Sequence, residues 1–299
     1  MVQNTKDGVQ EFLRHAFTME KISTEKRISD LVSRFDSLES FKNLDVSKKI
    51  FEKRDIREAQ RERLRKIQNI IDTRKDIQTN FVTYVYNRFA ENAADLISGL
   101  TAEKMVEESS INPFLAKALG LDNFDDLARY FVVQTMSRSL VTSFGTVLEI
   151  IIRVISCGQK GNWWDVVEGD NLWSIKSGPN DMNKDQVTEF SKRAIKANKA
   201  NKNSKPRILM TYGKKPHSVI SDTLKGKNLD PAKYTATGKQ VFELVTGDPN
   251  YHSTLLKIFS NYKRQGKTLL EMMDEKVEDL SKQFKQKYKN TNKLLDDTF

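Results

Sequence analysis

The sequence predicts an α/β (α+β) protein in which a short run of strands lies between a large helical N-terminal region and a helical C-terminal tail. Residues 7–98 lack proline and contain a single glycine, and their apolar residues recur at helical spacing. From residue 162, short apolar segments alternate with turn residues, as is typical of strands. Helical spacing returns after residue 252. The 299 residues suffice for one large domain or for one domain with a helical arm.

The helical N-terminal region is expected to extend to residue 108. The charge-rich residues 47–66 within it predict an exposed helix or arm. The region ends near Pro113, because proline disfavours helical conformation in the residue before it. Residues 122–155 then predict two helices, the second of which carries a lone acid, Glu149, among apolar residues.

The strands are predicted from short apolar segments separated by turns. The first two, 163–167 and 172–176, flank a tight Gly-Asp turn at 169–170. Further strands are expected at 207–212 and 240–245, and a basic helix over 187–201 precedes them. Helices are expected again over 253–262 and 268–294.

The predicted turn fixes which side chains of the first strand pair meet. If residues 169 and 170 form a two-residue loop, antiparallel pairing places Asp165 opposite Ser174, with Lys176 on the same face. The intervening residues of the second strand then point into a core. One face would therefore gather a carboxylate, a hydroxyl and an ammonium, although a purely structural Asp–Lys pair is the alternative. The tryptophans that flank the strands are expected chiefly in the core: Trp163, Trp164 and Trp173.

Positive charge is concentrated in one part of the chain. Lysine and arginine total 50 against 40 acidic residues, a net charge of +10. Residues 184–227 contain twelve basic and three acidic residues, a local net charge of +9. A polyanion is the natural partner of such a segment, because neutralised phosphates release condensed counterions. A basic surface that merely keeps the protein soluble is the alternative.

Several classes of protein are disfavoured by composition. No apolar run approaches the ~18 residues of a membrane span, and the N-terminus has no apolar signal core, so a cytosolic setting without membrane contact is expected. The single cysteine cannot form an internal disulfide, and the three scattered histidines do not match a zinc site. Gly266-Lys267-Thr268 lacks the first glycine of a phosphate-binding loop, so no nucleotide cofactor is expected.

Asp165 followed by Ser174-Ile175-Lys176 supplies much of what phosphodiester hydrolysis needs: a carboxylate for a hard divalent cation and an ammonium near the developing charge. The arrangement resembles the PD-(D/E)xK nuclease superfamily. Two positions depart from that pattern, since Trp164 replaces proline and Ser174 replaces the second acid.

A second carboxylate must therefore come from elsewhere. Glu149 is the first candidate, because some restriction enzymes of the superfamily combine Ser-x-Lys with a carboxylate from a helix. Glu168, Asp181 and Asp185 are weaker candidates. Below the superfamily, residues 110–114, 124–127, 144–149 and 175–183 are similar to type II restriction endonucleases that cut at sites with a GGNCC core. This resemblance covers about residues 109–246.

The resemblance implies a mixed central β-sheet of restriction-endonuclease type flanked by helices. It divides the chain into a helical region for dimerisation or for embracing DNA (1–108), a nuclease core (109–265) and a C-terminal helix (266–299). It also implies a prokaryotic cytoplasmic homodimer that cuts a palindromic duplex with Mg²⁺ and leaves 5′-phosphate and 3′-hydroxyl ends.

The resemblance further assigns residues to roles. The catalytic set is Asp165, Lys176, Glu149 and Ser174, and the metal ligands are Asp165, Glu149 and the carbonyl of Ile175. Four residues are expected to read bases: Asn180, Asn183, Lys184 and Gln186. Four others are expected to bind phosphates: Lys192, Arg193, Lys196 and Lys199. A non-catalytic nucleic-acid-binding or scaffold protein, and a repair or junction nuclease of the same superfamily, are the alternatives.

Overall fold

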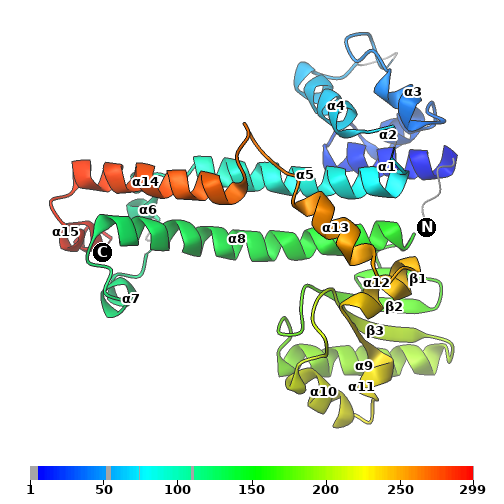
Figure 1. Ribbon diagram of the computed structural model, residues 1–299. Helices are drawn as coiled ribbons and strands as arrows, with labels where there is room; N and C mark the ends of the chain where they lie inside the picture. Colours follow the sequence, from blue (N-terminus) through cyan, green and yellow to red (C-terminus); the bar gives the residue numbers. More distant parts are fainter. Residues whose placement is uncertain (1–5, 52–54, 74, 109–110, 299) are drawn as a thin grey trace. The chain divides into compact units, whose positions relative to one another are not determined.

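The computed structural model describes residues 6–51, 55–73, 75–108 and 111–298 (Figure 1). They form two compact units. The first combines the chain up to Tyr86 with Val147–Phe259, and the second combines Asn87–Thr146 with the chain from Ser260 onwards. Residues 109 and 110, where the predicted nuclease core begins, lie outside the described residues.

The N-terminal part of the chain is helical, as predicted. Its helices are α1 (Lys6–Met19), α2 (Glu25–Val32), α3 (Leu38–Lys42), α4 (Glu58–Ile70) and α5 (Ile77–Ser98). Aromatic rings pack them together: Phe12 of α1 lies edge to face with Phe81 of α5, with ring centres 5.9 Å apart. The rings of Phe17 in α1 and Phe41 in α3 lie 5.3 Å apart.

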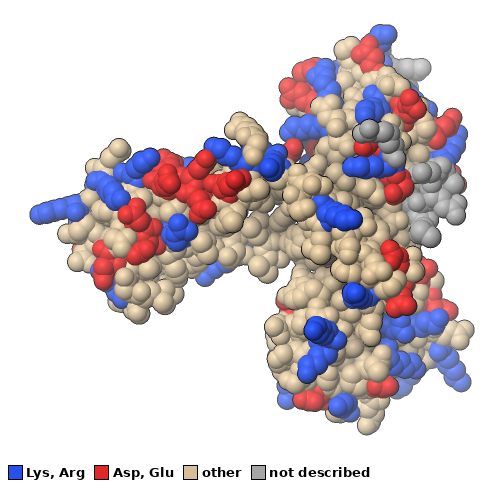
Figure 2. Space-filling view, in the orientation of Figure 1, with Lys and Arg blue, Asp and Glu red and all other residues tan. Residues whose placement is uncertain are grey.

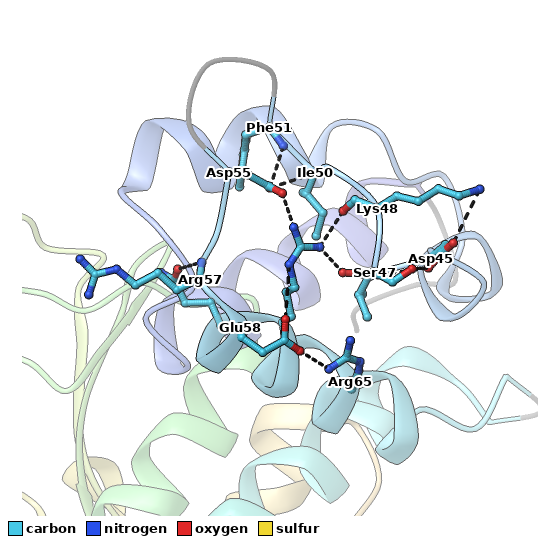
Figure 3. A network of polar contacts seen from close by, with 12 residues as sticks. Asp45, Ser47, Lys48, Ile50, Phe51, Asp55, Arg57, Glu58 and Arg65 are labelled. Atoms are coloured by element: carbon cyan, nitrogen blue, oxygen red, sulfur yellow. Dashed lines mark hydrogen bonds and ion pairs between the residues drawn. The ribbon is translucent and has the colours of Figure 1, made fainter.

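A network of polar contacts links α4 to residues 45–51 and to Asp55 (Figure 3). Arg61 of α4 donates hydrogen bonds to the carbonyls of Val46 and Lys48 and forms an ion pair with Asp55. The Asp55 carboxylate also accepts a hydrogen bond from the backbone N–H of Ile50, at 3.0 Å. Arg61 therefore anchors the described residues that precede α4 to the helix, and this charge-rich part of the chain does not form a wholly exposed arm.

The sheet is mixed. Its strands are β1 (Val166–Glu168), β2 (Asn171–Lys176), β3 (Lys205–Met210) and β4 (Thr235–Thr237), which lie in the order β1-β2-β3-β4. Strands β1 and β2 are antiparallel, whereas β2, β3 and β4 are mutually parallel. Parallel neighbours need crossover connections. Helix α9 (Lys184–Ala200) connects β2 to β3, and α10 (Ser218–Lys225) and α11 (Pro231–Tyr234) connect β3 to β4.

Helices α9 and α10 cover one face of the sheet. Ile208 and Met210 of β3 are fully buried there, in a cluster that includes Val187 and Phe190 of α9 and Ile220 of α10. These strand residues lie opposite Ser174 and Lys176 in the parallel pair β2–β3, so those two residues belong to the same face.

The opposite face is covered by the C-terminal end of α8 (Phe124–Ile155) and by α12 (Lys239–Thr246). Trp173 and Ile175 of β2 are buried there with Ile152 of α8 and Val241 of α12. The predicted fold class, a mixed sheet flanked by helices, is confirmed.

The predicted strand over residues 240–245 is wrong, because these residues belong to helix α12 and the strand β4 ends before them. Gly238 turns the chain between the two with φ +51° and ψ −119°, a conformation that favours glycine. Val241 and Leu244 then pack against the sheet at helical spacing. An apolar run of six residues is compatible with the period of a strand and with that of a helix, so its spacing alone does not distinguish the two structures.

The prediction of two helices over residues 122–155 is also wrong, because α8 runs without a break. Gly145 lies inside the helix, where glycine destabilises by only about 1 kcal/mol relative to alanine. Helix α13 (Tyr251–Phe259) agrees with the sequence prediction and packs on α12, with the rings of Phe242 and Tyr251 6.3 Å apart.

The named secondary-structure elements in the described residues of the second unit are all helices. It contains α6 (Ala102–Glu107), α7 (Pro113–Ala118), α14 (Leu269–Lys287), α15 (Thr291–Asp296) and the adjoining parts of α5 and α8. Leu127 and Phe131 of α8 are buried with Leu280 and Phe284 of α14. The predicted helix over 268–294 is thus interrupted once, at residues 288–290. None of the described helices is both long and apolar enough to cross a membrane.

Candidate active site

The hairpin of β1 and β2 brings Asp165 to Ser174. Glu168 lies opposite Asn171 and Val166 lies opposite Trp173, which is the register that a turn at residues 169–170 requires. One carboxylate oxygen of Asp165, Oδ2, accepts hydrogen bonds from the backbone N–H of Ile175 at 2.7 Å and from the hydroxyl of Ser174 at 3.3 Å. Asp165, which immediately precedes β1, is therefore hydrogen-bonded to the edge of β2. These bonds hold its carboxylate in one orientation.

Ser174 and Lys176 open onto a pocket of about 330 Å³ that β2 shares with α9. The polar residues that α9 contributes to this pocket are Asp185, Gln186, Glu189 and Arg193. Its other lining residues are Trp163, Trp164, Met182 and Phe190. A strand hydroxyl, a strand ammonium and the carboxylates of a facing helix thus share one cavity beside Asp165.

The turn after β2 sets the position of α9. The Asp181 carboxylate accepts a hydrogen bond from the backbone N–H of Gly178 at 2.7 Å. Asn183 and Gln186 then form a capping box, in which each side chain accepts a hydrogen bond from the backbone N–H of the other, at 2.9 and 3.0 Å. Two of the predicted base-reading residues therefore also fix the start of α9.

Glu149 lies apart from this pocket. It is three residues before Ile152 on α8, and so shares the stripe of that helix that packs against the other face of the sheet. Its carboxylate lies 3.8 Å from both the Arg153 guanidinium and the Lys160 ammonium. The structure thus brings Asp165 together with Ser174, and places Glu149 on the helix behind the sheet.

The other acids differ in their surroundings. Glu168 accepts a hydrogen bond from the Asn171 side chain at the tip of the hairpin, at 2.5 Å. Asp181 caps the turn after β2, whereas Asp185 lines the pocket. Glu189, which sequence reasoning did not single out, lines it too. The spacing of residues 186, 189, 190 and 193 places them on one face of the helix. This spacing could have identified Glu189 as a site residue only if the strand that the face packs against had been known.

Trp163 does not lie in the core, contrary to the sequence prediction. Its side chain is 67% exposed, whereas Trp173 is 1% exposed. The Arg193 guanidinium stacks over the Trp163 ring, 4.9 Å from its centre, and donates a hydrogen bond to Glu189 at 3.1 Å. Trp163 precedes β1 and does not belong to it. Its ring is therefore covered by the Arg193 guanidinium and does not pack against the sheet.

The exposed side of α9 is basic. Lys192, Lys196 and Lys199 are exposed and recur at helical spacing, which places them on one stripe. Lys184 is exposed at the start of the helix, and Asn180 is exposed in the turn that precedes it. Lys and Arg side chains are prominent over the sheet and its crossover helices, whereas α14 carries both signs of charge (Figure 2).

The donor set suits a hard divalent cation. Among the described residues, no three His, Cys, Asp or Glu side chains cluster in a way that could hold a metal ion. Mg²⁺ does not need such a cluster, because it is commonly held by one or two carboxylates together with substrate phosphates and water. The oriented Asp165 carboxylate, with a second carboxylate from a nearby helix, fits that requirement.

Comparison with known families gives one match. The family model described as Type II restriction endonuclease EcoO109I matches residues 75–267, about two thirds of the chain. The matched range includes the hairpin, the pocket and α9. No curated protein sequence matches this chain.

Proposed function

Because this chain belongs to the family of the type II restriction endonuclease EcoO109I, we propose that it cuts double-stranded DNA at a specific sequence with Mg²⁺. The products are 5′-phosphate and 3′-hydroxyl ends, and the site is palindromic with a GGNCC-like core. The observation that carries this proposal is the hydrogen bond between Asp165 and Ser174, next to a pocket that Ser174 and Lys176 share with a basic helix.

Asp165 and Lys176 are the central catalytic groups of this proposal. Two hydrogen bonds fix the orientation of the Asp165 carboxylate just before the start of β1, and this carboxylate would hold the cation. When bound there, Mg²⁺ supplies a Lewis acid that polarises the phosphoryl group and acidifies water. The Lys176 ammonium, on the same face as Ser174, orients the attacking water and stabilises charge that develops on the phosphate.

Ile175 contributes its backbone. Its N–H points toward Asp165, and the N–H and C=O of one strand residue point to the same edge. The Ile175 carbonyl therefore faces the edge where Asp165 lies, which supports its proposed role as a metal ligand. Ser174 orients the aspartate through its hydroxyl but carries no charge. A second carboxylate is still required, and Glu149 is the one proposed from the sequence.

DNA binding is proposed to use the two ends of the exposed side of α9. Side chains at its start reach base edges: Asn180, Asn183, Lys184 and Gln186. Side chains further along bind phosphates: Lys192, Arg193, Lys196 and Lys199. In this scheme the side-chain oxygens of Asn183 and Gln186 can accept hydrogen bonds from bases only if DNA binding opens their capping box, whereas their amide NH2 groups can donate without that change.

A digest of phage DNA with Mg²⁺ tests this function. Discrete fragments with ligatable 5′-phosphate ends are expected. A smear or cutting confined to branched DNA would indicate a repair or junction nuclease, and uncut DNA that shifts in a gel would indicate a non-catalytic binding protein. Either of the last two results would contradict the proposal.

The proposed enzyme acts as a cytoplasmic homodimer, each subunit cutting one strand. Residues 1–108 serve dimerisation or embrace DNA, residues 109–265 form the nuclease core, and residues 266–299 form a C-terminal helical segment. Sedimentation equilibrium should give twice the mass of the chain, which is 34.5 kDa. A monomer both alone and on a palindromic duplex would contradict this part of the proposal.

A further inference from the structure

The sheet separates the residues of the proposed site into two groups. Ser174 and Lys176 face α9, whereas Trp173 and Ile175 face α8. A carboxylate that acts beside Lys176 is therefore most directly supplied from the α9 side. Glu149, in contrast, belongs to the helix that packs against the other face.

Two acids of α9 share the pocket with Lys176. Asp185 lies in the first turn of the helix, and Glu189 lies one turn further in, next to the buried Phe190. Of these two acids, Glu189 is anchored to another residue of the pocket lining, since Arg193 donates a hydrogen bond to its carboxylate at 3.1 Å. Arg193 lies on the same helix and is itself stacked on Trp163, which precedes β1, so a residue outside α9 helps to hold the partner of Glu189 in place.

The chemistry of the strand explains why such a carboxylate is needed. Ser174 occupies the position at which an acid would stand beside Asp165, and a hydroxyl cannot supply negative charge. The pocket that opens from Ser174 has its acids on the facing helix. A carboxylate from α9 thus compensates, across the pocket, for the acid that the strand lacks.

We infer that Glu189 of α9 is the second acidic residue of the active site, acting with Asp165 in place of the acid missing at Ser174. The inference rests on the proposed nuclease function, because it assigns a ligand for the cation which that function requires. In the DNA-free protein, Arg193 holds Glu189 at the pocket and neutralises it. An approaching phosphate competes for Arg193, so DNA binding frees the carboxylate for the cation.

Terbium binding tests the assignment without relying on cleavage. Tb³⁺ prefers the same oxygen ligands as Mg²⁺ and luminesces when a nearby indole is excited, and Trp164 lines this pocket. The full-length protein is titrated with Tb³⁺ alone and the luminescence is fitted to a dissociation constant. Glu189→Gln is expected to weaken Tb³⁺ binding at least about tenfold.

The control variants separate Glu189 from its neighbours. Glu149→Gln and Asp185→Asn are expected to change the Tb³⁺ dissociation constant less than about twofold. Arg193→Gln removes the cation that hydrogen-bonds Glu189 but keeps the carboxylate and its 3.8 Å ion pair with Lys192, so it should leave Tb³⁺ binding unchanged or tighten it. If the effect of Glu189→Gln were only the loss of the Glu189–Arg193 pair, Arg193→Gln would weaken binding as well.

Two kinds of failure are distinguishable. Unchanged Tb³⁺ affinity in Glu189→Gln, with a loss in Glu149→Gln or Asp185→Asn, would overturn the assignment while leaving the nuclease function intact. Unchanged affinity in Asp165→Asn, or no saturable binding by the wild-type protein, would overturn both. Circular dichroism of each variant checks that the fold is retained.

Discussion

Asp165 has two tasks, because the carboxylate proposed to bind metal also accepts the Ile175 N–H at the edge of the sheet. Asp165→Asn can keep this hydrogen bond through its amide oxygen, whereas Asp165→Ala leaves the N–H without an acceptor. Both variants are expected to lose cleavage, but only the alanine variant should also lose about 1–3 kcal/mol of unfolding free energy. Urea denaturation and a plasmid digest measure the two effects. Equal stability of the two variants would show that the hydrogen bond contributes nothing.

Lys176 is expected to matter for chemistry and little for DNA affinity. Lys176→Met keeps the length of the side chain but removes the ammonium that the mechanism places near the developing charge. Cleavage should fall below detection, while DNA affinity measured with Ca²⁺ in place of Mg²⁺ should change by less than about tenfold. Retained cleavage would instead favour the structural interpretation of the Asp–Lys pair.

Gly238 is the residue on which the β4–α12 turn depends. A Cβ built at this position lies 2.6 Å from the backbone oxygen of Gly213, and φ is +51°. Gly238→Ala is therefore expected to destabilise the protein by about 2 kcal/mol or more. Gly247→Ala is the matched control, since its φ is +76° but nothing lies within 4 Å of its Cβ. A loss of about 1 kcal/mol is expected there. Thermal unfolding of both variants provides the comparison.

At the residue scale, the sequence predicted the meeting of Asp165 with Ser174 because a two-residue turn determines the register of a hairpin. It did not predict the pocket with α9, because the amphipathic pattern of a helix does not reveal which strand it faces. From the sequence, Glu189 was therefore only one of three acidic residues in a basic segment, and no role was predicted for it.

Among the elements, the loop before α4 depends on charge and therefore on pH. Burial raises the pKa of the Asp55 carboxyl, but hydrogen bonds from the backbone N–H groups of Ile50, Ile56 and Phe51, together with nearby Arg61, outweigh it. The folded-state pKa is lower than the ordinary value of 3.8. The contribution of Asp55 to stability is thus fully present above that value and is lost as the pH falls through the folded-state pKa.

Asp55→Asn should accordingly destabilise the protein at pH 7. The difference in unfolding free energy from the wild type should shrink as the pH falls below about 4, because the wild-type carboxyl protonates first in the unfolded state and only at lower pH in the folded state. Urea denaturation at pH 7, 5 and 3 measures the trend. A difference that stays constant over this range would show that the charge of Asp55 does not stabilise the loop.

Element predictions succeeded over the N-terminal helices and α9, and the failures at residues 240–245 and in α8 have different causes. The longer helices of the first hundred residues (α1, α4 and α5) and α9 follow from several turns of consistent spacing. Residues 240–245 offered only six positions, and the conformation of Gly238 decided for a helix. In α8 the sequence contained a glycine that a long helix tolerates, so the predicted break does not exist.

For the whole molecule, the uneven charge predicts how salt affects DNA binding. The triple variant with Lys192, Lys196 and Lys199 changed to alanine should reduce the slope of log affinity against log salt by up to ~0.9 for each lost phosphate contact. A control triple on the mixed-charge helix α14 and its C-terminal flank, with Lys282, Lys285 and Lys289 changed to alanine, should leave the slope unchanged. Fluorescence anisotropy at several salt concentrations measures both. Equal slopes would place the DNA contacts elsewhere.

The order of helical, mixed and helical regions could be predicted because composition changes along the chain. The grouping into units could not, because it depends on contacts between distant segments. Asn87–Thr146 belongs with the chain from Ser260 onwards, and the residues between them belong to the first unit.

This interleaving limits how the gene can be dissected. The borders at Tyr86/Asn87 and Thr146/Val147 fall inside α5 and α8, so a simple truncation at either border would leave a severed helix on each side. Neither unit is one continuous stretch of polypeptide. Producing either of them alone would require rejoined or circularly permuted coding sequences, or fragments that reassemble after co-expression.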